Sequence, residues 1–127
     1  MKIVENEYIK FWIDNGILHS EYKYQFEMNL ENSEEIYTLR KQISEGKKQY
    51  FLYDISNLKS MSKGARDYGS SHGMEDLAAS AIIINSSITL LIYNIFIKLK
   101  KVEIPVKAFR NKEEAIDWLN KIKKLNS

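Results

Sequence analysis

Cysteine is absent from the 127 residues of this chain. A disulfide, a thiolate metal site and a cysteine nucleophile are therefore excluded. Proline occurs only at Pro105, and the balance of 44% hydrophobic and 28% charged residues is that of an ordinary globular domain. A chain without cysteine suits a reducing compartment, and the charged N-terminal residues do not resemble a signal peptide. We therefore expect a cytoplasmic protein.

An excess of charge of one sign is also missing. Nineteen basic and 17 acidic residues leave a net charge of +2. A surface that binds phosphates needs clustered lysine and arginine, so we expect no nucleic-acid partner. The lysine groups at 98–101 and 121–124 fall where helices are expected to end, and cations are favourable at that end of the helix dipole.

One uncharged run, Leu77–Ile97, is long enough to cross a bilayer. Its polar residues gather at the centre, around Asn85–Ser87, where insertion into lipid costs most. A buried strand at Ala78–Ile84, followed by an amphipathic helix at Ile88–Leu99 capped by Asn85 or Ser86, explains the apolar ends and the polar middle. We expect no membrane span.

The rest of the chain divides into short strands and helices. Asn15-Gly16 between two aromatic and β-branched runs predicts a hairpin. Asn32 and Glu35 form a capping-box pattern, which predicts a helix that begins at Asn32 and ends at Gly46. The further predicted elements are a strand at Tyr50–Tyr53, a glycine-weakened helix within Ser60–Glu75, a strand at Ile104–Phe109 and a last helix capped by Asn111.

Strands that alternate with helices predict right-handed crossovers and a mostly parallel sheet. The hairpin adds an antiparallel partner to this sheet. We expect one α/β domain over residues 1–127, with a five-stranded mixed sheet and about four helices.

No catalytic signature stands out. The two histidines, His19 and His72, lack the paired spacing of a metal site. The glycines match no phosphate-binding loop, and no GxSxG elbow occurs. Two of the three pairs of adjacent carboxylates, Glu34–Glu35 and Glu113–Glu114, open predicted helices, where acids stabilise the N-terminal end of the dipole. We predict no catalytic residue, no metal and no cofactor.

A family resemblance appears at Tyr53–Tyr68, where a strand ending in Asp54 is followed by Ile-Ser, a short loop and a small-residue helix. Together with the strand Val106–Phe109 and the helix containing Trp118-Leu119, this segment resembles the STAS-like domains of bacteria, including the SpoIIAA-like group. The resemblance covers roughly residues 8–125. It implies a sheet of four or five strands with helices packed against it.

The resemblance implies a non-enzymatic regulatory or scaffolding domain that acts through protein–protein contact, as anti-sigma factor antagonists do, or through a homodimer. In that group a serine of an Asp-Ser-Ser-Gly loop is phosphorylated. Ser62-Lys63-Gly64 lies at about that place, but the acidic residue is missing and Lys63 replaces the second serine. The switch or partner loop implied in this way consists of Asp54, Ser56, Ser60, Ser62, Lys63, Arg66, Asp67 and Tyr68.

Two other functions stay open. The resemblance to SEC14-like proteins implies binding of a lipid or another apolar molecule. This alternative predicts a closed, mostly apolar pocket of at least about 300 Å³ under the helix at Ile88–Leu99. The wall of that pocket would consist of Ile88, Leu91, Ile92, Ile95 and Phe96. The third alternative, an enzyme, requires a deep cleft that gathers Asp54, Ser56, Arg66 and Asp67.

Overall fold

A computed structural model of the chain describes residues 2–86, 89–90, 93–94, 97 and 103–127. The strands are β1 (Lys2–Glu5), β2 (Ile9–Asp14), β3 (Ile17–Tyr22), β4 (Phe26–Met28), β5 (Gln49–Asp54), β6 (Leu58–Met61), β7 (Leu77–Ile83) and β8 (Val106–Phe109). The helices with defined bounds are α1 (Leu30–Ser44), α2 (Lys63–His72) and α4 (Lys112–Leu125). Thr89, Leu90, Tyr93, Asn94 and Ile97 are also helical.

The main sheet has the strand order β1-β2-β3-β5-β7-β8. The β1, β2 and β3 strands pair antiparallel, and the pairs β3–β5, β5–β7 and β7–β8 are parallel. The predicted α/β class with a mixed sheet is confirmed. The predicted count of five strands is one too low for this sheet, because β1 adds an outer strand, and β4 and β6 form a separate parallel pair.

The predicted hairpin is present between β2 and β3. Asn15 and Gly16 have φ angles of 51° and 75°, which is the left-handed conformation that this dipeptide tolerates in a tight turn. Lys123 of α4 donates a hydrogen bond to the Asn15 carbonyl at 2.8 Å. The turn is therefore tied to the C-terminal helix as well as to its own strands.

The first helix begins one turn earlier than the sequence predicts. Asn29 is the N-cap: its side chain accepts from the Asn32 backbone at 2.9 Å, and the Asn32 side chain accepts from the Asn29 backbone at 2.8 Å. This reciprocal pair satisfies two backbone donors, so the predicted cap at Asn32 with Glu35 is wrong. At the other end Glu45 and Gly46 both have positive φ angles, and Glu45 is the C-cap.

Two other boundaries differ from the prediction. The last strand begins at Val106 rather than Ile104, because Pro105 has no backbone N–H to contribute to the sheet. Its carbonyl instead accepts from Ser80 of β7 at 3.0 Å. The glycine-weakened region contains β6 and then a continuous helix, α2, which is capped by Ser62 and anchored by the buried side chain of Ala65.

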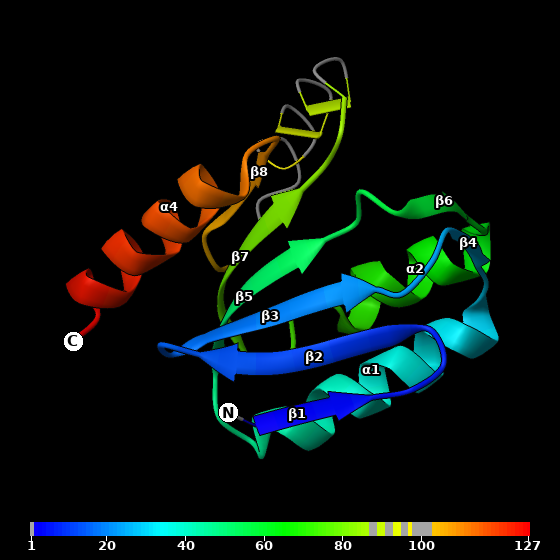
Figure 1. Cartoon of the computed structure of the whole chain (residues 1–127), viewed down its shortest axis with the longest axis horizontal. Helices are drawn as coiled ribbons and strands as arrows, with labels where there is room; N and C mark the ends of the chain where they lie inside the picture. The colour runs from blue at the N-terminus through cyan, green and yellow to red at the C-terminus, as the bar shows by residue number, and fades with distance from the viewer. Residues whose placement is uncertain (1, 87–88, 91–92, 95–96, 98–102) are drawn as a thin grey trace.

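Helices cover both faces of the sheet (Figure 1). On one face α4 places the fully buried Leu119 against Ala79 and Ala81 of β7, whose small side chains allow close approach. On the other face α1 packs over β1 and β2, and α2 lies beside α1. Successive residues of β5 accordingly pack in opposite directions, with Phe51 toward α1 and Leu52 toward α4.

In its described residues, the uncharged run divides as predicted into a strand and a helical segment. Ser86 accepts hydrogen bonds from Thr89 at 3.4 Å and, through its carbonyl, from Leu90 at 2.9 Å. Leu90 and Tyr93 pack against the end of β7 and against β8, on the same face as α1 and α2. Within the described part of the chain, no helix is long and apolar enough to cross a membrane.

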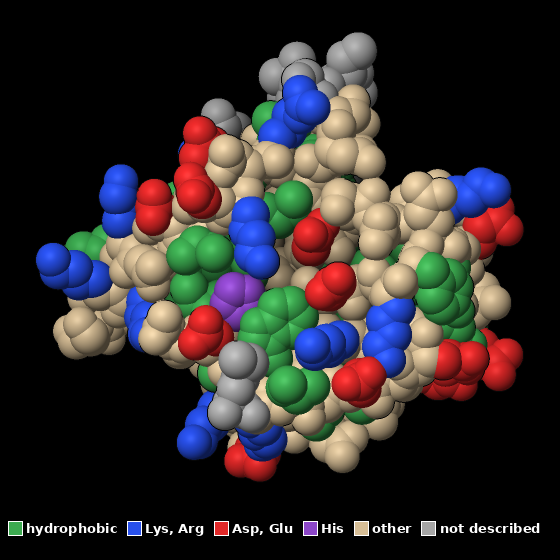
Figure 2. All heavy atoms as spheres, in the orientation of Figure 1, with side chains coloured by type: hydrophobic (Ala, Val, Ile, Leu, Met, Phe, Trp, Pro, Cys, Tyr) green, Lys and Arg blue, Asp and Glu red, His purple; other side chains and the backbone are tan. Residues whose placement is uncertain are grey.

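The face shown in Figure 2 carries acidic and basic side chains that are interspersed rather than segregated. Hydrophobic side chains appear between them in small groups. The +2 net charge of the sequence is thus not gathered into one basic area on this face.

Candidate functional site

A pocket of about 390 Å³ lies on the face of the sheet that carries α1 and α2. The strands β2, β3, β5, β7 and β8 form its floor. Its walls come from α1, α2, the turn after α2 and the helical residues Tyr93 and Ile97. The described residues that line it are Phe11, Tyr22, Met28, Ser33, Ile36, Tyr37, Arg40, Phe51, Tyr53, Met61, Ala65, Arg66, Tyr68, Gly69, Ser70, Gly73, Met74, Ser80, Ile82, Tyr93, Ile97 and Val106.

The lining is mainly aromatic and aliphatic, because alternate residues of each strand point to this face. Its volume falls within the range of roughly 300–1,000 Å³ that is usual for small-molecule sites. Tyr93 and Ile97 place the pocket beside the segment where the sequence predicts an apolar wall. The five residues named for that wall, 88, 91, 92, 95 and 96, lie outside the described residues.

Arg40 of α1 brings a positive charge to the pocket, although the residue is only 7% exposed. Its guanidinium donates to the carbonyls of Gly73 and Glu75, at 2.9 Å each. The same group lies over the rings of Tyr37 and Phe51, with centroids at 5.2 and 5.3 Å. Burial lowers the pKa of Arg40, since the charged form loses its hydration.

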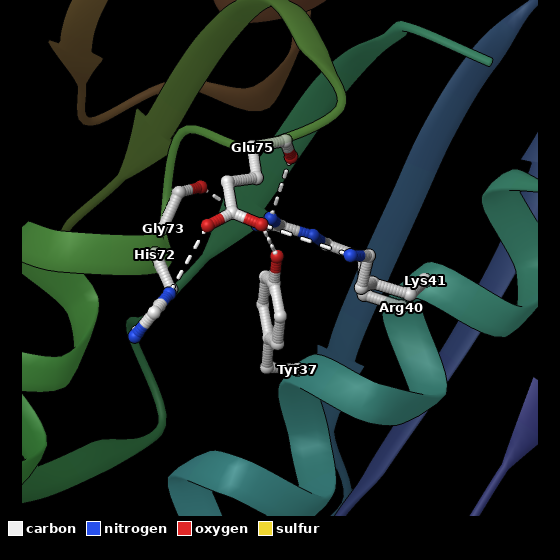
Figure 3. A network of polar contacts seen from close by, with 6 residues as sticks. All are labelled: Tyr37, Arg40, Lys41, His72, Gly73 and Glu75. Carbon is white, nitrogen blue, oxygen red and sulfur yellow. Dashed lines mark hydrogen bonds and ion pairs between the residues drawn. The ribbon is translucent and has the colours of Figure 1, made fainter. Parts of the chain in front are cut away.

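The Glu75 carboxylate is surrounded by three donors beside the pocket (Figure 3). The Tyr37 hydroxyl donates to it, His72 Nδ1 lies 3.0 Å away, and Lys41 forms an ion pair at 3.7 Å. The hydrogen bonds from Tyr37 and His72 lower the pKa of Glu75 to about 2. The carboxylate therefore stays ionised near neutral pH and joins α1 to the turn that follows α2.

Two tyrosine hydroxyls meet at the sheet side of the pocket. Tyr22 of β3 and Tyr53 of β5 lie 2.6 Å apart, oxygen to oxygen. Burial raises the pKa of Tyr53 to about 12 and the pKa of Tyr22 well above its ordinary value. Both hydroxyls are therefore neutral donors or acceptors at physiological pH.

The predicted loop residues do not form one cluster. Asp54 ends β5 and accepts from the backbone and the hydroxyl of Ser56, at 3.0 and 2.5 Å, which closes a local turn. Ser60 lies exposed on β6. Among the described residues, no hydrogen bond or ion pair joins Asp54 or Ser56 to Arg66 or Asp67, so the contacts of an assembled catalytic group are not seen there.

The α2 part of the predicted loop is divided between the surface and the pocket. Ser62 is exposed at the N-cap, where its hydroxyl accepts from Ala65 at 3.1 Å. Lys63 pairs with Asp67 at 3.0 Å on the outer side. Arg66 and Tyr68 line the pocket.

Sequence reasoning missed the polar part of the pocket. No motif singles out Arg40 or Tyr37 in the sequence, and Glu75 belongs to one of the pairs of adjacent carboxylates. A hydrophobic stripe interrupted by an arginine was the only local signal. Within the described ranges, no group of three or more His, Cys, Asp or Glu side chains gathers as metal ligands would.

Residues 11–123 match the sequence model of a family described as a domain of unknown function, DUF7793. The chain belongs to this family. Among solved structures, an uncharacterized protein of the DUF3478 family with a SpoIIAA-like fold, from Shewanella loihica PV-4, is similar with a TM-score of 0.67. The match has 20% sequence identity and covers 91% of this chain and 97% of that chain. A comparison with curated proteins found no match.

This DUF7793 member therefore has a SpoIIAA-like fold, as the resemblance of its sequence predicts. At 20% identity the similarity concerns the fold alone. Function has to be inferred from the residues of the chain itself.

Proposed function

We propose that this chain is a non-enzymatic binding domain that holds a small apolar molecule in the pocket beside α1 and α2. The observation that carries the proposal is the pocket itself, which has a volume of about 390 Å³ and a mainly aromatic and aliphatic lining. An apolar molecule that enters it exchanges contact with water for contact with Phe11, Phe51 and Ile82.

The distribution of the candidate catalytic residues supports binding over catalysis. A catalytic group needs its acid, base or nucleophile within hydrogen-bond reach of one another. Asp54 and Ser56 instead close a turn at the end of β5, and Asp67 pairs with Lys63 on the surface. Of the four residues that an enzymatic function would require, only Arg66 lines the pocket.

A titration with decan-1-ol, followed by calorimetry and by two-dimensional NMR, tests the proposal. We expect saturable binding, with shifts of amides in β5, β7 and α2. Gly69→Leu should abolish it, because Gly69 lines the pocket and its added side chain begins in open space. Ser71→Leu is the matched control, since Ser71 is an exposed α2 residue outside the lining. Absence of saturable binding, or equal binding to both variants, contradicts the proposal.

A second candidate function is regulation through contact with a protein partner, and the exposed position of Ser62 favours it. A phosphate on this N-cap hydroxyl would lie at the positive end of the α2 dipole, near Lys63 and Arg66. Phosphopeptide mass spectrometry of the chain isolated from its native cells tests the modification, and affinity capture with Ser62→Asp against Ser62→Ala tests a switch. Identical partners for the two variants and an unmodified Ser62 would rule out this mechanism.

Self-association through a sheet edge remains a prediction of the resemblance. The outermost strand, β1, leaves three of its four residues exposed, so its free edge is open to pairing with a second copy. Light scattering during gel filtration distinguishes a monomer from a dimer.

A further inference from the structure

The buried cation of Arg40 has no carboxylate bound to it among the described residues. The hydrogen bonds of its guanidinium go to two backbone carbonyls, those of Gly73 and Glu75. An arginine carries five N–H donors, and these two bonds use only two of them. A neutral carbonyl satisfies a donor but does not neutralise the charge, and a buried charge without a counter-ion is costly.

The acidic side chains that act on Arg40, Glu75 and Asp76, form no ion pair with it. Glu75 and Asp76 act on Arg40 through space, but the Glu75 carboxylate is bound by Tyr37, His72 and Lys41. No ion pair within 4.0 Å links Arg40 to any described carboxylate. Arg40 thus brings to a mainly apolar pocket a positive charge that no described carboxylate contacts directly.

The side chains around Arg40 keep its planar group in place. The rings of Tyr37 and Phe51 lie against it, and the two carbonyl bonds hold it from the side of the turn after α2. The positive charge acts on Tyr22, Tyr37, Tyr53 and Tyr68, all of which line the pocket. A fixed guanidinium surrounded by tyrosines matches a planar anion with two acceptor oxygens.

We infer that the ligand of this pocket is an amphipathic monocarboxylate, with its carboxylate on Arg40 and its apolar body over Phe11, Phe51 and Ile82. This inference rests on the proposed binding function and specifies the chemical class of its ligand. The carboxylate supplies the missing negative charge, and the apolar body fills the remaining volume. A cationic amphiphile is excluded by the same charge.

Three probes with the same ten-carbon chain and different head groups test the inference on the wild-type chain: decanoate, decan-1-ol and decylamine. We expect decanoate to bind about tenfold or more tightly than decan-1-ol, because a charge-assisted bond replaces a neutral one. Decylamine should bind more weakly than decan-1-ol. Equal affinity for decanoate and decan-1-ol overturns the carboxylate inference and leaves apolar binding intact, whereas no binding of any probe overturns both.

Variants then assign the head group to one arginine. Arg40→Lys keeps the charge but loses the planar fork, and we expect it to lose about tenfold in decanoate affinity while its affinity for decan-1-ol is unchanged. Arg66→Lys is the matched control, because Arg66 lines the same pocket but is exposed. Loss of the decanoate preference in Arg66→Lys and its retention in Arg40→Lys would place the anion elsewhere. If Arg40→Lys fails to fold, the head-group ratio of the wild-type chain still decides the inference.

Discussion

Gly69 and Gly73 form a matched pair in one helix for which the structure predicts opposite responses to alanine. Gly69 lies within α2, and an added methyl group there meets nothing within 4 Å. Gly73 is the C-cap, and its added methyl group would lie 2.4 Å from the Gly69 carbonyl oxygen. The Gly73 carbonyl also accepts the Arg40 hydrogen bond, so a shift of this residue disturbs the anchor of α1.

The two effects have different origins. Gly69→Ala should raise the free energy of unfolding by about 0.5–1 kcal/mol, because alanine loses less backbone entropy than glycine in a helix. Gly73→Ala should lower it by roughly 1–3 kcal/mol, which is the usual cost of forcing extra atoms into a filled space. The clash is with backbone rather than with a flexible side chain, so the last turn of α2 has to move.

Urea denaturation followed by circular dichroism measures the change in the free energy of unfolding for both variants. With an m-value of about 1–3 kcal/mol/M, the midpoint should rise by roughly 0.4 M for Gly69→Ala and fall by at least that amount for Gly73→Ala. Equal m-values would show that the native and unfolded states are otherwise comparable. A midpoint that falls for Gly69→Ala, or that is unchanged for Gly73→Ala, would refute this account of α2.

Three further predictions concern other parts of the fold. Leu119→Ala should lower the free energy of unfolding by about 2–5 kcal/mol, since this α4 side chain is fully buried against the sheet. The control is Leu125→Ala, which should change it by less than about 0.5 kcal/mol because Leu125 is 84% exposed. Ser62→Ala should lower the free energy of unfolding by about 0.5–2 kcal/mol, because the α2 N-cap hydrogen bond is lost. Burial and Lys112 lower the pKa of His19, so the unfolded chain binds protons more readily and stability should fall as pH drops below about 6.5, a dependence that His19→Phe removes.

Thermal and urea unfolding check all three. A Leu119→Ala variant as stable as the Leu125→Ala control would mean that α4 is not packed on β7 as described. An unchanged melting temperature in Ser62→Ala would show that the Ser62 cap does not stabilise the fold. For the histidine, the midpoints are compared between about pH 7.5 and pH 5.5, and a decline that is as steep in His19→Phe as in the wild-type chain would assign the dependence to other groups.

Elements with strong local signals could be predicted from the sequence alone. The Asn15-Gly16 turn is specified by two residues that tolerate positive φ angles, and the last helix by the Asn111 side chain that accepts from Glu114 at 3.1 Å. The central strand β7 could be predicted because the uncharged run that contains it is interrupted by a polar cluster. Local patterns of this kind persist in the folded chain because each depends on neighbours only a few residues away.

Features that depend on residues far apart in the sequence became visible only in the folded chain. The β4 and β6 strands are three and four residues long and pair across about 30 intervening positions, so neither carries a strong pattern of its own. The pocket has the same origin: Arg40 reaches a turn 33 residues away, and Tyr22 meets Tyr53 across 31. A sequence shows which residues can be charged or apolar, but the packing of α1 and α2 on the sheet decides that a buried arginine faces an apolar cavity.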